Sequence, residues 1–108
     1  MKPLSTLTET IINLIAQVPE GKVATYGQVA KLAGSPRSAR QVSRVLHSCS
    51  QKYQLPWHRI VSSQGKISIP KDQPSHQEQV NRLLKEGVVL GLNDAVDLSR
   101  FQWKNSSR

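Results

Sequence analysis

The sequence predicts a mainly α-helical domain with one small β-hairpin, arranged as a winged helix-turn-helix-like fold. Apolar residues recur at helical spacing in four stretches, each with start or stop signals at its ends. A tight Gly-Ser-Pro corner at residues 34–36 joins two of these helices, as in a helix-turn-helix. A chain of 108 residues has room for one core, so residues 1–108 are predicted to form a single domain.

Two helices are predicted in the first third of the chain. Thr6 and Glu9 form a capping-box pattern for the first helix, which residues 19–22 (Pro-Glu-Gly-Lys) should stop. Its buried side is predicted to contain Leu7, Ile11, Ile12, Leu14, Ile15 and Val18. The second helix is predicted to begin after Thr25, with Gln28 completing another capping box, and to end at Gly34.

A third helix should follow at once, with Ser35 as its N-cap and Pro36 at its first position. It is predicted to run towards Ser48, so that the helix-turn-helix spans about residues 25–48. Its predicted buried side consists of Ala39, Val42, Val45 and Leu46.

The second half of the chain is predicted to alternate loops with short elements. A loop carrying Cys49 and Tyr53 precedes residues 56–61, and residues 60–61 and 66–67 are predicted to pair as a hairpin across a turn. Ser75 and Glu78 should cap a fourth helix that ends at Gly87, with Val80, Leu83 and Leu84 inside. The tail, residues 91–108, is predicted to pack onto the core through Leu98, Phe101 and Trp103.

The charge of the chain favours a polyanionic partner. Fifteen Lys and Arg against seven Asp and Glu give a net charge of +8, and no acidic residue occurs between positions 21 and 71. Arg37, Arg40 and Arg44 are spaced so that they would share one face of the third helix. This pattern predicts contact with DNA, the alternative being a solvated surface stripe.

Several classes of site are not expected. The single cysteine, Cys49, excludes an internal disulfide and a multi-cysteine zinc site, and the three histidines are not spaced like zinc ligands. No cofactor and no metal are therefore predicted. The first residues lack the apolar segment of a signal peptide, and no apolar run has the length of a membrane span. The expectation is a cytoplasmic, monomeric protein.

Four segments resemble, in unbroken order, the O6-alkylguanine-DNA alkyltransferases. They are residues 18–30 (Val-Pro-Glu-Gly-Lys-Val-Ala-Thr-Tyr-Gly-Gln-Val-Ala), 39–42 (Ala-Arg-Gln-Val), 56–61 (Pro-Trp-His-Arg-Ile-Val) and 83–87 (Leu-Leu-Lys-Glu-Gly). The resemblance covers about residues 8–90 and implies the fold of the alkyltransferase C-terminal domain. It also identifies residues 56–61 as the pocket segment.

Trp57 stands where the resemblance places the cysteine that takes up the alkyl group. An indole has no ionisable thiol and no comparable nucleophile, so the chain looks like a non-enzymatic, alkyltransferase-like protein. Without the resemblance, Trp57 would be interpreted as a core or partner-binding aromatic residue, and His58 as a structural histidine. With it, His58 and Glu86 match a proton relay that has lost its thiol and is vestigial.

The resemblance further implies that the chain flips a nucleotide out of duplex DNA. Arg40 matches the arginine that fills the gap in the duplex, and Tyr26 matches the tyrosine beside the phosphate of the flipped nucleotide. The expected lesion pocket contains Tyr26, Trp57, Arg59 and Lys71, although Lys71 fits a solvated loop lysine equally well. In that family the recognition helix enters the minor groove, which suits binding that is indifferent to sequence.

Three functions remain open from the sequence. The leading hypothesis is a sensor that binds O6-alkylguanine in double-stranded DNA and flags it for repair, with nucleotide excision repair proteins as the implied partners. The second is an enzyme that keeps a residual dealkylating step. The third is a helix-turn-helix transcriptional regulator, which would read the major groove with sequence preference.

Overall fold

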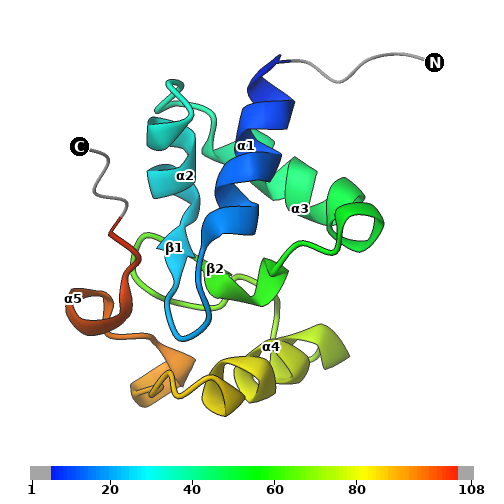
Figure 1. The fold of residues 1–108 in the computed structure, drawn as a ribbon. Coiled ribbons are helices and arrows are strands. Elements are labelled where there is room, and N and C mark those ends of the chain that lie inside the picture. Colours follow the sequence, from blue (N-terminus) through cyan, green and yellow to red (C-terminus); the bar gives the residue numbers. More distant parts are fainter. Residues whose placement is uncertain (1–5, 105–108) are drawn as a thin grey trace.

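The structure, a computed structural model, describes residues 6–104 and confirms a mainly helical fold with a small two-stranded sheet (Figure 1). Three helices form one layer, and the sheet lies between this layer and the fourth helix, α4 (Figure 1). The elements are α1 (Thr6–Gln17), β1 (Ala24–Thr25), α2 (Tyr26–Leu32), α3 (Ala39–Tyr53), η1 (Trp57–Arg59), β2 (Ile60–Val61), α4 (Pro74–Lys85), η2 (Leu92–Asp94) and α5 (Leu98–Phe101), where η denotes a 3-10 helix.

The sheet joins segments that are distant in the sequence, and the predicted hairpin is wrong. β1 pairs with β2 in parallel, with Ala24 opposite Ile60. Residues 66–67 form no strand, although the Ser62 N–H still donates to the Lys66 carbonyl across 2.9 Å. The chain turns away at Gly65, which adopts a φ of +79° and whose carbonyl accepts from the Val96 N–H. A side chain at residue 65 would collide with the Val96 carbonyl, so only glycine fits there.

The strands divide their side chains between two apolar clusters, because successive residues of a strand face opposite sides. Ala24 and Ile60 belong to the upper cluster, whereas Val23 and Val61 belong to the lower one. The upper cluster also contains Ile11, Ile12, Leu14, Ile15, Val18, Val29, Ala30, Val42, Val45 and Leu55. The lower cluster is completed by Leu83, Val88, Val96 and Phe101. The short sheet therefore holds the helical layer and α4 in a fixed relation.

The capping residues predicted from the sequence are found at only some of the helix starts. Thr25 and Gln28 form the predicted capping box of α2. In α1, Thr6 is already helical, so the residue that would cap it lies outside the described residues. In α3 the predicted start is wrong, because residues 35–38 form a turn closed by the Ser38 N–H and the Ser35 carbonyl. Pro36 occupies the second position of that turn, a position that also favours proline.

Two further boundaries differ from the prediction. α3 continues to Tyr53, so the segment with Cys49 is helical and not a loop. α4 has Gln73 as its N-cap and Pro74 at its first position, so Ser75 is not the cap. Leu84, expected inside, is 53% exposed because it lies on the outer side of α4.

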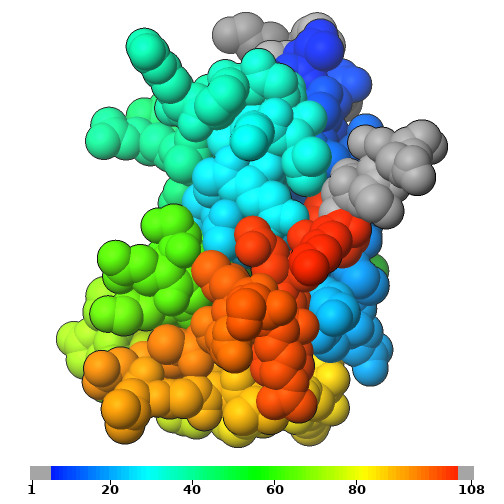
Figure 2. Space-filling view, turned by 90° about the vertical axis from the view of Figure 1, so that its left-hand side faces the viewer, coloured from blue at the N-terminus to red at the C-terminus, as the bar shows by residue number. Residues whose placement is uncertain are grey.

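The C-terminal segment packs against the first third of the chain, as predicted (Figure 2). The Val23 N–H donates to the Phe101 carbonyl over 2.9 Å, and the Trp103 N–H donates back to the Val23 carbonyl over 2.6 Å. Figure 2 shows this orange-to-red segment below α2 and over α4. Residues 105–108 of the predicted tail lie outside the described residues.

Candidate nucleic-acid interface

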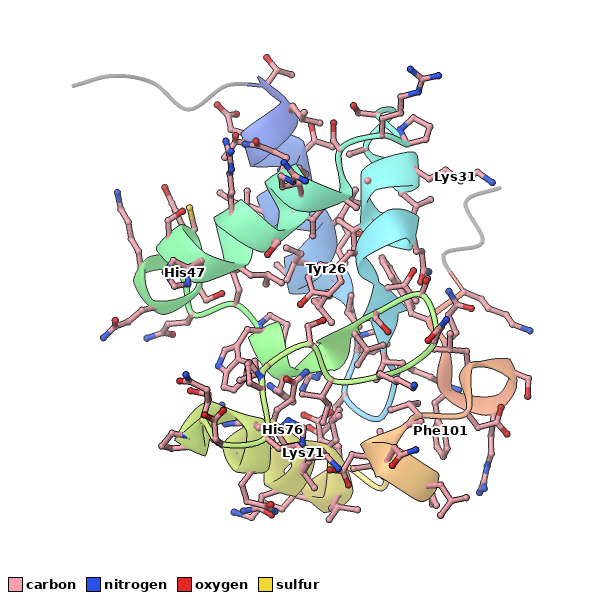
Figure 3. All side chains as sticks on the ribbon, turned by 180° about the vertical axis from the view of Figure 1, so that it is seen from behind. Tyr26, Lys31, His47, Lys71, His76 and Phe101 are labelled. Carbon is pink, nitrogen blue, oxygen red and sulfur yellow. The ribbon has the colours of Figure 1, made fainter. Side chains whose placement is uncertain are left out.

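An open pocket of about 1050 Å³ lies between the C-terminal half of α3, the segment around η1 and α4. Its lining combines polar and apolar side chains, namely Tyr26, Ser43, Leu46, His47, Ser50, Gln51, Gln54, Leu55, Trp57, Ile60, Ser68, Ile69, Ser75, Glu78, Gln79 and Arg82. Tyr26 lies beneath α3 and His47 lies on that helix, while His76 belongs to α4 and Lys71 lies beside it (Figure 3). The pocket therefore opens between two layers of the molecule.

Trp57 forms one wall of this pocket and is held by its neighbours. Its backbone N–H donates to the Leu55 carbonyl over 2.8 Å, and the Arg59 N–H donates to the Pro56 carbonyl over 3.0 Å, which starts η1. The buried Gln79 on α4 donates to the carbonyls of His58 and Ile60, each over 3.1 Å. Since Gln79 satisfies one carbonyl within η1 and one directly after it, it fixes the backbone that presents the indole.

Arg82 contacts the indole and is a pocket residue that the sequence did not identify. Its guanidinium lies 5.5 Å from the centroid of the Trp57 ring, within range of a cation–π contact. Glu78, one helical turn earlier, accepts two hydrogen bonds from Arg82, at 2.7 and 3.0 Å. The spacing of four residues between Glu78 and Arg82 was the available signal, but the contact with Trp57 depends on the fold.

The structure places Tyr26 and Trp57, both expected in the lesion pocket, in the lining of the same pocket. Tyr26 is the first residue of α2, directly after the capping residue Thr25, so the capping box fixes where its ring emerges. The opposite wall is the C-terminal half of α3, including His47 and Ser50. The Ser50 hydroxyl is buried and has no hydrogen-bond partner among residues 6–104, so it is a free polar group beside the pocket.

The three predicted DNA-binding arginines are all exposed, but they do not share one helix. Arg37 lies in the turn before α3, whereas Arg40 and Arg44 lie on α3, one turn apart. No hydrogen bond or ion pair to another described residue restrains the Arg40 guanidinium. Arg40 is therefore free to reach a partner.

Arg40 also projects on the pocket side of α3. Residues seven apart complete almost two helical turns and lie on the same side, which places Arg40 in line with His47. The buried residues Val42 and Val45 occupy the other side of the helix. One face of α3 thus carries a free cation at its start and a pocket wall at its end.

His58 and Arg59, which directly follow Trp57 in the chain, form a compact ion-pair cluster with Glu86. His58 Nε2 lies 2.7 Å from Glu86 Oε2, and the Arg59 guanidinium donates to both carboxylate oxygens at 2.7–3.1 Å. The Gly21 N–H donates to Glu86 Oε1 over 3.0 Å, and Arg59 also donates to the Val18 carbonyl. The cluster therefore ties η1 and α4 to the segment that follows α1.

The Glu86 carboxyl is ionised at all ordinary pH values. Burial alone would raise its pKa, but hydrogen bonds from Arg59, His58 and the Gly21 backbone outweigh burial and lower the pKa to about 2. A carboxylate held in this state is a weak base, so it is suited to holding its neighbours and not to accepting a proton.

Arg59 and Lys71 were predicted to line the lesion pocket, and the structure does not place them there. Neither is among the described residues that line it. The Arg59 guanidinium is occupied by Glu86, 27 residues further along the chain. Lys71 is exposed beside α4 and close to His76 (Figure 3). Arg82 supplies the cationic group of the pocket lining instead.

The described residues contain neither a cluster suited to a metal ion nor a membrane-spanning helix. Within residues 6–104, no group of three or more His, Cys, Asp and Glu could hold a metal. No helix in this range is long and apolar enough to cross a membrane. Cys49 is half-buried, and its sulfur lies 3.6 Å from the Ser48 hydroxyl.

Comparison with known proteins identifies relatives along most of the chain. The chain is 44% identical to the DNA base-flipping protein of Escherichia coli over 95% of its own length and 78% of the relative. It is 33% identical to Alkyltransferase-like protein 1 of Schizosaccharomyces pombe over 87% of its length and 91% of the relative. A crystal structure of S. pombe Atl1 in complex with damaged DNA containing O6-carboxymethylguanine matches with a TM-score of 0.82 and 30% identity. That match covers 95% of this chain and 99% of Atl1.

The model of one protein family matches residues 6–88, which include the pocket and the ion-pair cluster. Its description is the DNA-binding domain of 6-O-methylguanine DNA methyltransferase. The match extends over more than half of the chain and agrees with the relatives named above. The chain therefore belongs to the family of the 6-O-methylguanine DNA methyltransferase DNA-binding domain, as an alkyltransferase-like member.

Proposed function

We propose that this protein is a non-enzymatic DNA-damage sensor that binds O6-alkylguanine in duplex DNA by flipping the nucleotide into the pocket beside Trp57. The observation that carries the proposal is the single face of α3 that bears Arg40 at its start and a pocket wall at its end. An arginine that enters the duplex there leaves the extruded base on the same side as Trp57 and Tyr26. The names of the two relatives and the damaged DNA bound to Atl1 support this function.

The pocket has a chemistry that suits recognition. Trp57 offers a broad aromatic surface for stacking against a base, and base–aromatic stacking contributes about 1–3 kcal/mol. Flipping costs least where base pairing is already weakened, as at an alkylated guanine, so the preference for damage arises partly from the DNA itself. Phosphate contacts by the exposed lysines and arginines would supply most of the affinity, which should therefore fall steeply with salt.

Retained dealkylation has little support from the groups near Trp57. Removal of the alkyl group needs a strong nucleophile, and an indole is not one. Neither His58 nor Glu86 is among the described residues that line the pocket. Glu86 is held as an anion by Arg59 and His58, so activation of a water molecule for attack would have to overcome that pairing.

The central test compares matched duplexes that contain either guanine or O6-methylguanine. We expect binding to the lesion duplex to be tighter by about tenfold or more, since about 1.4 kcal/mol of saved flipping cost suffices. Equilibrium titration measures the affinity, and mass spectrometry of protein and DNA afterwards should find both masses unchanged. A methylated protein or a restored guanine would establish an enzyme. Equal affinity for both duplexes with preference for one sequence would establish a regulator.

We further propose that the protein acts as a cytoplasmic monomer and that nucleotide excision repair proteins receive the marked lesion. The net charge of +8 supports a DNA partner and contributes to keeping the chains apart in solution. Titration of nucleotide excision repair proteins onto the preformed protein–lesion complex tests the second part. No change in their affinity for the lesion duplex when this protein is present would contradict it.

Arg82→Ala is expected to weaken lesion binding by about twofold to fivefold, because an exposed cation–π contact contributes about 0.5–1 kcal/mol. The loss should come from a less restrained Trp57 ring, which fluorescence anisotropy of Trp57 measures in a Trp103→Phe background. Glu78→Gln is the matched control, because it removes the partner of Arg82 and leaves the cation beside the indole. An equal loss in both variants would assign the effect to the Glu78–Arg82 pair instead.

A further inference from the structure

His76 is a buried imidazole in the first turn of α4, and both of its ring nitrogens have partners. Nδ1 lies 2.7 Å from the carbonyl oxygen of Ile69, and Nε2 lies 3.0 Å from the carboxylate oxygen Oδ2 of Asp94. Only 6% of the residue is exposed, so water has little access to either contact.

Both partners of His76 are hydrogen-bond acceptors. A backbone carbonyl has no proton to donate, and an ionised carboxylate also only accepts. A neutral imidazole carries one N–H and could satisfy only one of them, which would leave the other contact between two lone pairs. The geometry therefore requires a ring that carries a proton on each nitrogen.

The contacts of His76 connect the edge of the pocket to the rest of the molecule. Ile69 lines the pocket together with Ser68, and Ser75 on α4 lines it directly before His76. Asp94 belongs to η2, where its φ of +56° places it in the left-handed region. His76 thus joins the pocket edge, α4 and η2 at one point, and Figure 3 labels it on α4.

We propose that His76 is a positioning residue for the lesion pocket, whose imidazolium fastens Ile69 at the pocket edge to α4 and Asp94. The pocket is then preorganised for the flipped base only while the ring carries both protons. This inference rests on the proposed lesion-binding function and identifies His76 as a residue that sets the affinity of the pocket for the lesion.

The charges around His76 decide the direction of the pH dependence. The hydrogen bond to Asp94 and the one to the Ile69 carbonyl raise the pKa of His76, whereas burial and the nearby Lys71 oppose them. On its own helix, the residues three and four positions later are uncharged, Gln79 and Val80. Because the pKa is raised in the folded protein, the bridge is complete below the ordinary value of 6.5. It is lost as the pH rises through the raised value.

The test measures the ratio of affinities for O6-methylguanine and guanine duplexes between about pH 6 and about pH 9. For the wild-type protein we expect this ratio to fall by about tenfold as the pH rises, since a charge-assisted hydrogen bond is lost. Use of the ratio removes pH effects that act equally on the binding of both duplexes.

Asp94→Asn is the decisive variant, because an amide can donate to Nε2 and so allows a neutral ring to satisfy both contacts. Its lesion preference should be nearly independent of pH. Asparagine also tolerates the left-handed backbone at this position, so the fold should be kept, which thermal unfolding checks. His76→Ala should have the reduced ratio at every pH.

Nitrogen NMR of the histidine rings gives a readout that does not involve DNA. We expect both His76 nitrogens to have imidazolium shifts near pH 6, with a titration that Asp94→Asn moves to lower pH. A neutral His76 near pH 6, or the same pH response of the ratio in wild type and Asp94→Asn, would overturn the inference. Lack of lesion preference at every pH would instead contradict the proposed function, whatever the state of His76.

Discussion

Glu86→Ala is expected to lower the free energy of unfolding by about 3 kcal/mol, because it leaves the Arg59 cation buried without its partner. The same change removes the acceptor for His58 and for the Gly21 N–H, so η1 and the segment after α1 lose a common attachment. Urea unfolding monitored by circular dichroism measures the change.

The pH dependence of stability gives an independent check on Glu86. Its folded pKa of about 2 lies below the ordinary value of 4.5, so the stabilisation is complete above pH 4.5 and is lost as the pH falls towards 2. Glu86→Ala should therefore flatten the acid limb of the stability curve. Glu78→Ala is the matched control: its pair with Arg82 is about half exposed and should contribute less than about 1 kcal/mol. An equal loss of unfolding free energy in Glu86→Ala and Glu78→Ala would show that the cluster around Glu86 does not stabilise the fold more than an exposed ion pair does.

Arg40→Ala is expected to abolish the preference for O6-methylguanine, bringing the ratio of affinities for lesion and guanine duplexes close to one. Without a side chain to occupy the gap in the duplex, the flipped state loses the interaction that offsets its cost of a few kcal/mol. Fluorescence titration of both duplexes gives the ratio. A 2-aminopurine beside the lesion reports whether the base still leaves the stack.

Arg44→Ala separates flipping from general attraction to DNA. Arg44 lies one turn further along α3, is exposed and is not among the described pocket residues. Its loss should weaken binding to both duplexes by the same factor and reduce the slope of affinity against salt by about one. If Arg40→Ala behaves in this way too, Arg40 contacts phosphate only and the flipping role is wrong.

Local signals in the sequence predicted those parts of the fold that local chemistry decides. The Thr25–Gln28 capping box needs only residues within one turn, and it is present as predicted. Pro36 was wrongly assigned to a helix start. Proline is favoured both at the first position of a helix and at the second position of a turn, so the residue alone does not distinguish the two. The hairpin failed for a different reason: β2 pairs with β1, which lies about 35 residues earlier, and no short pattern encodes that choice.

In the candidate site, too, contacts between residues distant in the sequence were the ones that could not be predicted. Tyr26 and Trp57 were predicted to share a pocket from resemblance, and the fold brings them together. Arg59 was expected in the lesion pocket, yet it forms an ion pair with Glu86, which directly follows α4 and lies 27 residues further along the chain. The wall formed by the end of α3 was missed, although no glycine or proline interrupts the chain between Pro36 and Pro56.

The continuous α3 helix makes the distance between Arg40 and the pocket a fixed quantity. His47 follows Arg40 by seven residues, which corresponds to about 10 Å along a rigid helix. The helix therefore fixes both the distance and the direction from Arg40 to the pocket wall. A substitution on the exposed face of α3 would change the affinity for DNA but keep this geometry. One inserted residue would rotate the pocket wall by about 100° relative to Arg40. Such a chain could still fold and bind DNA, but the extruded base would face the wrong side of the helix.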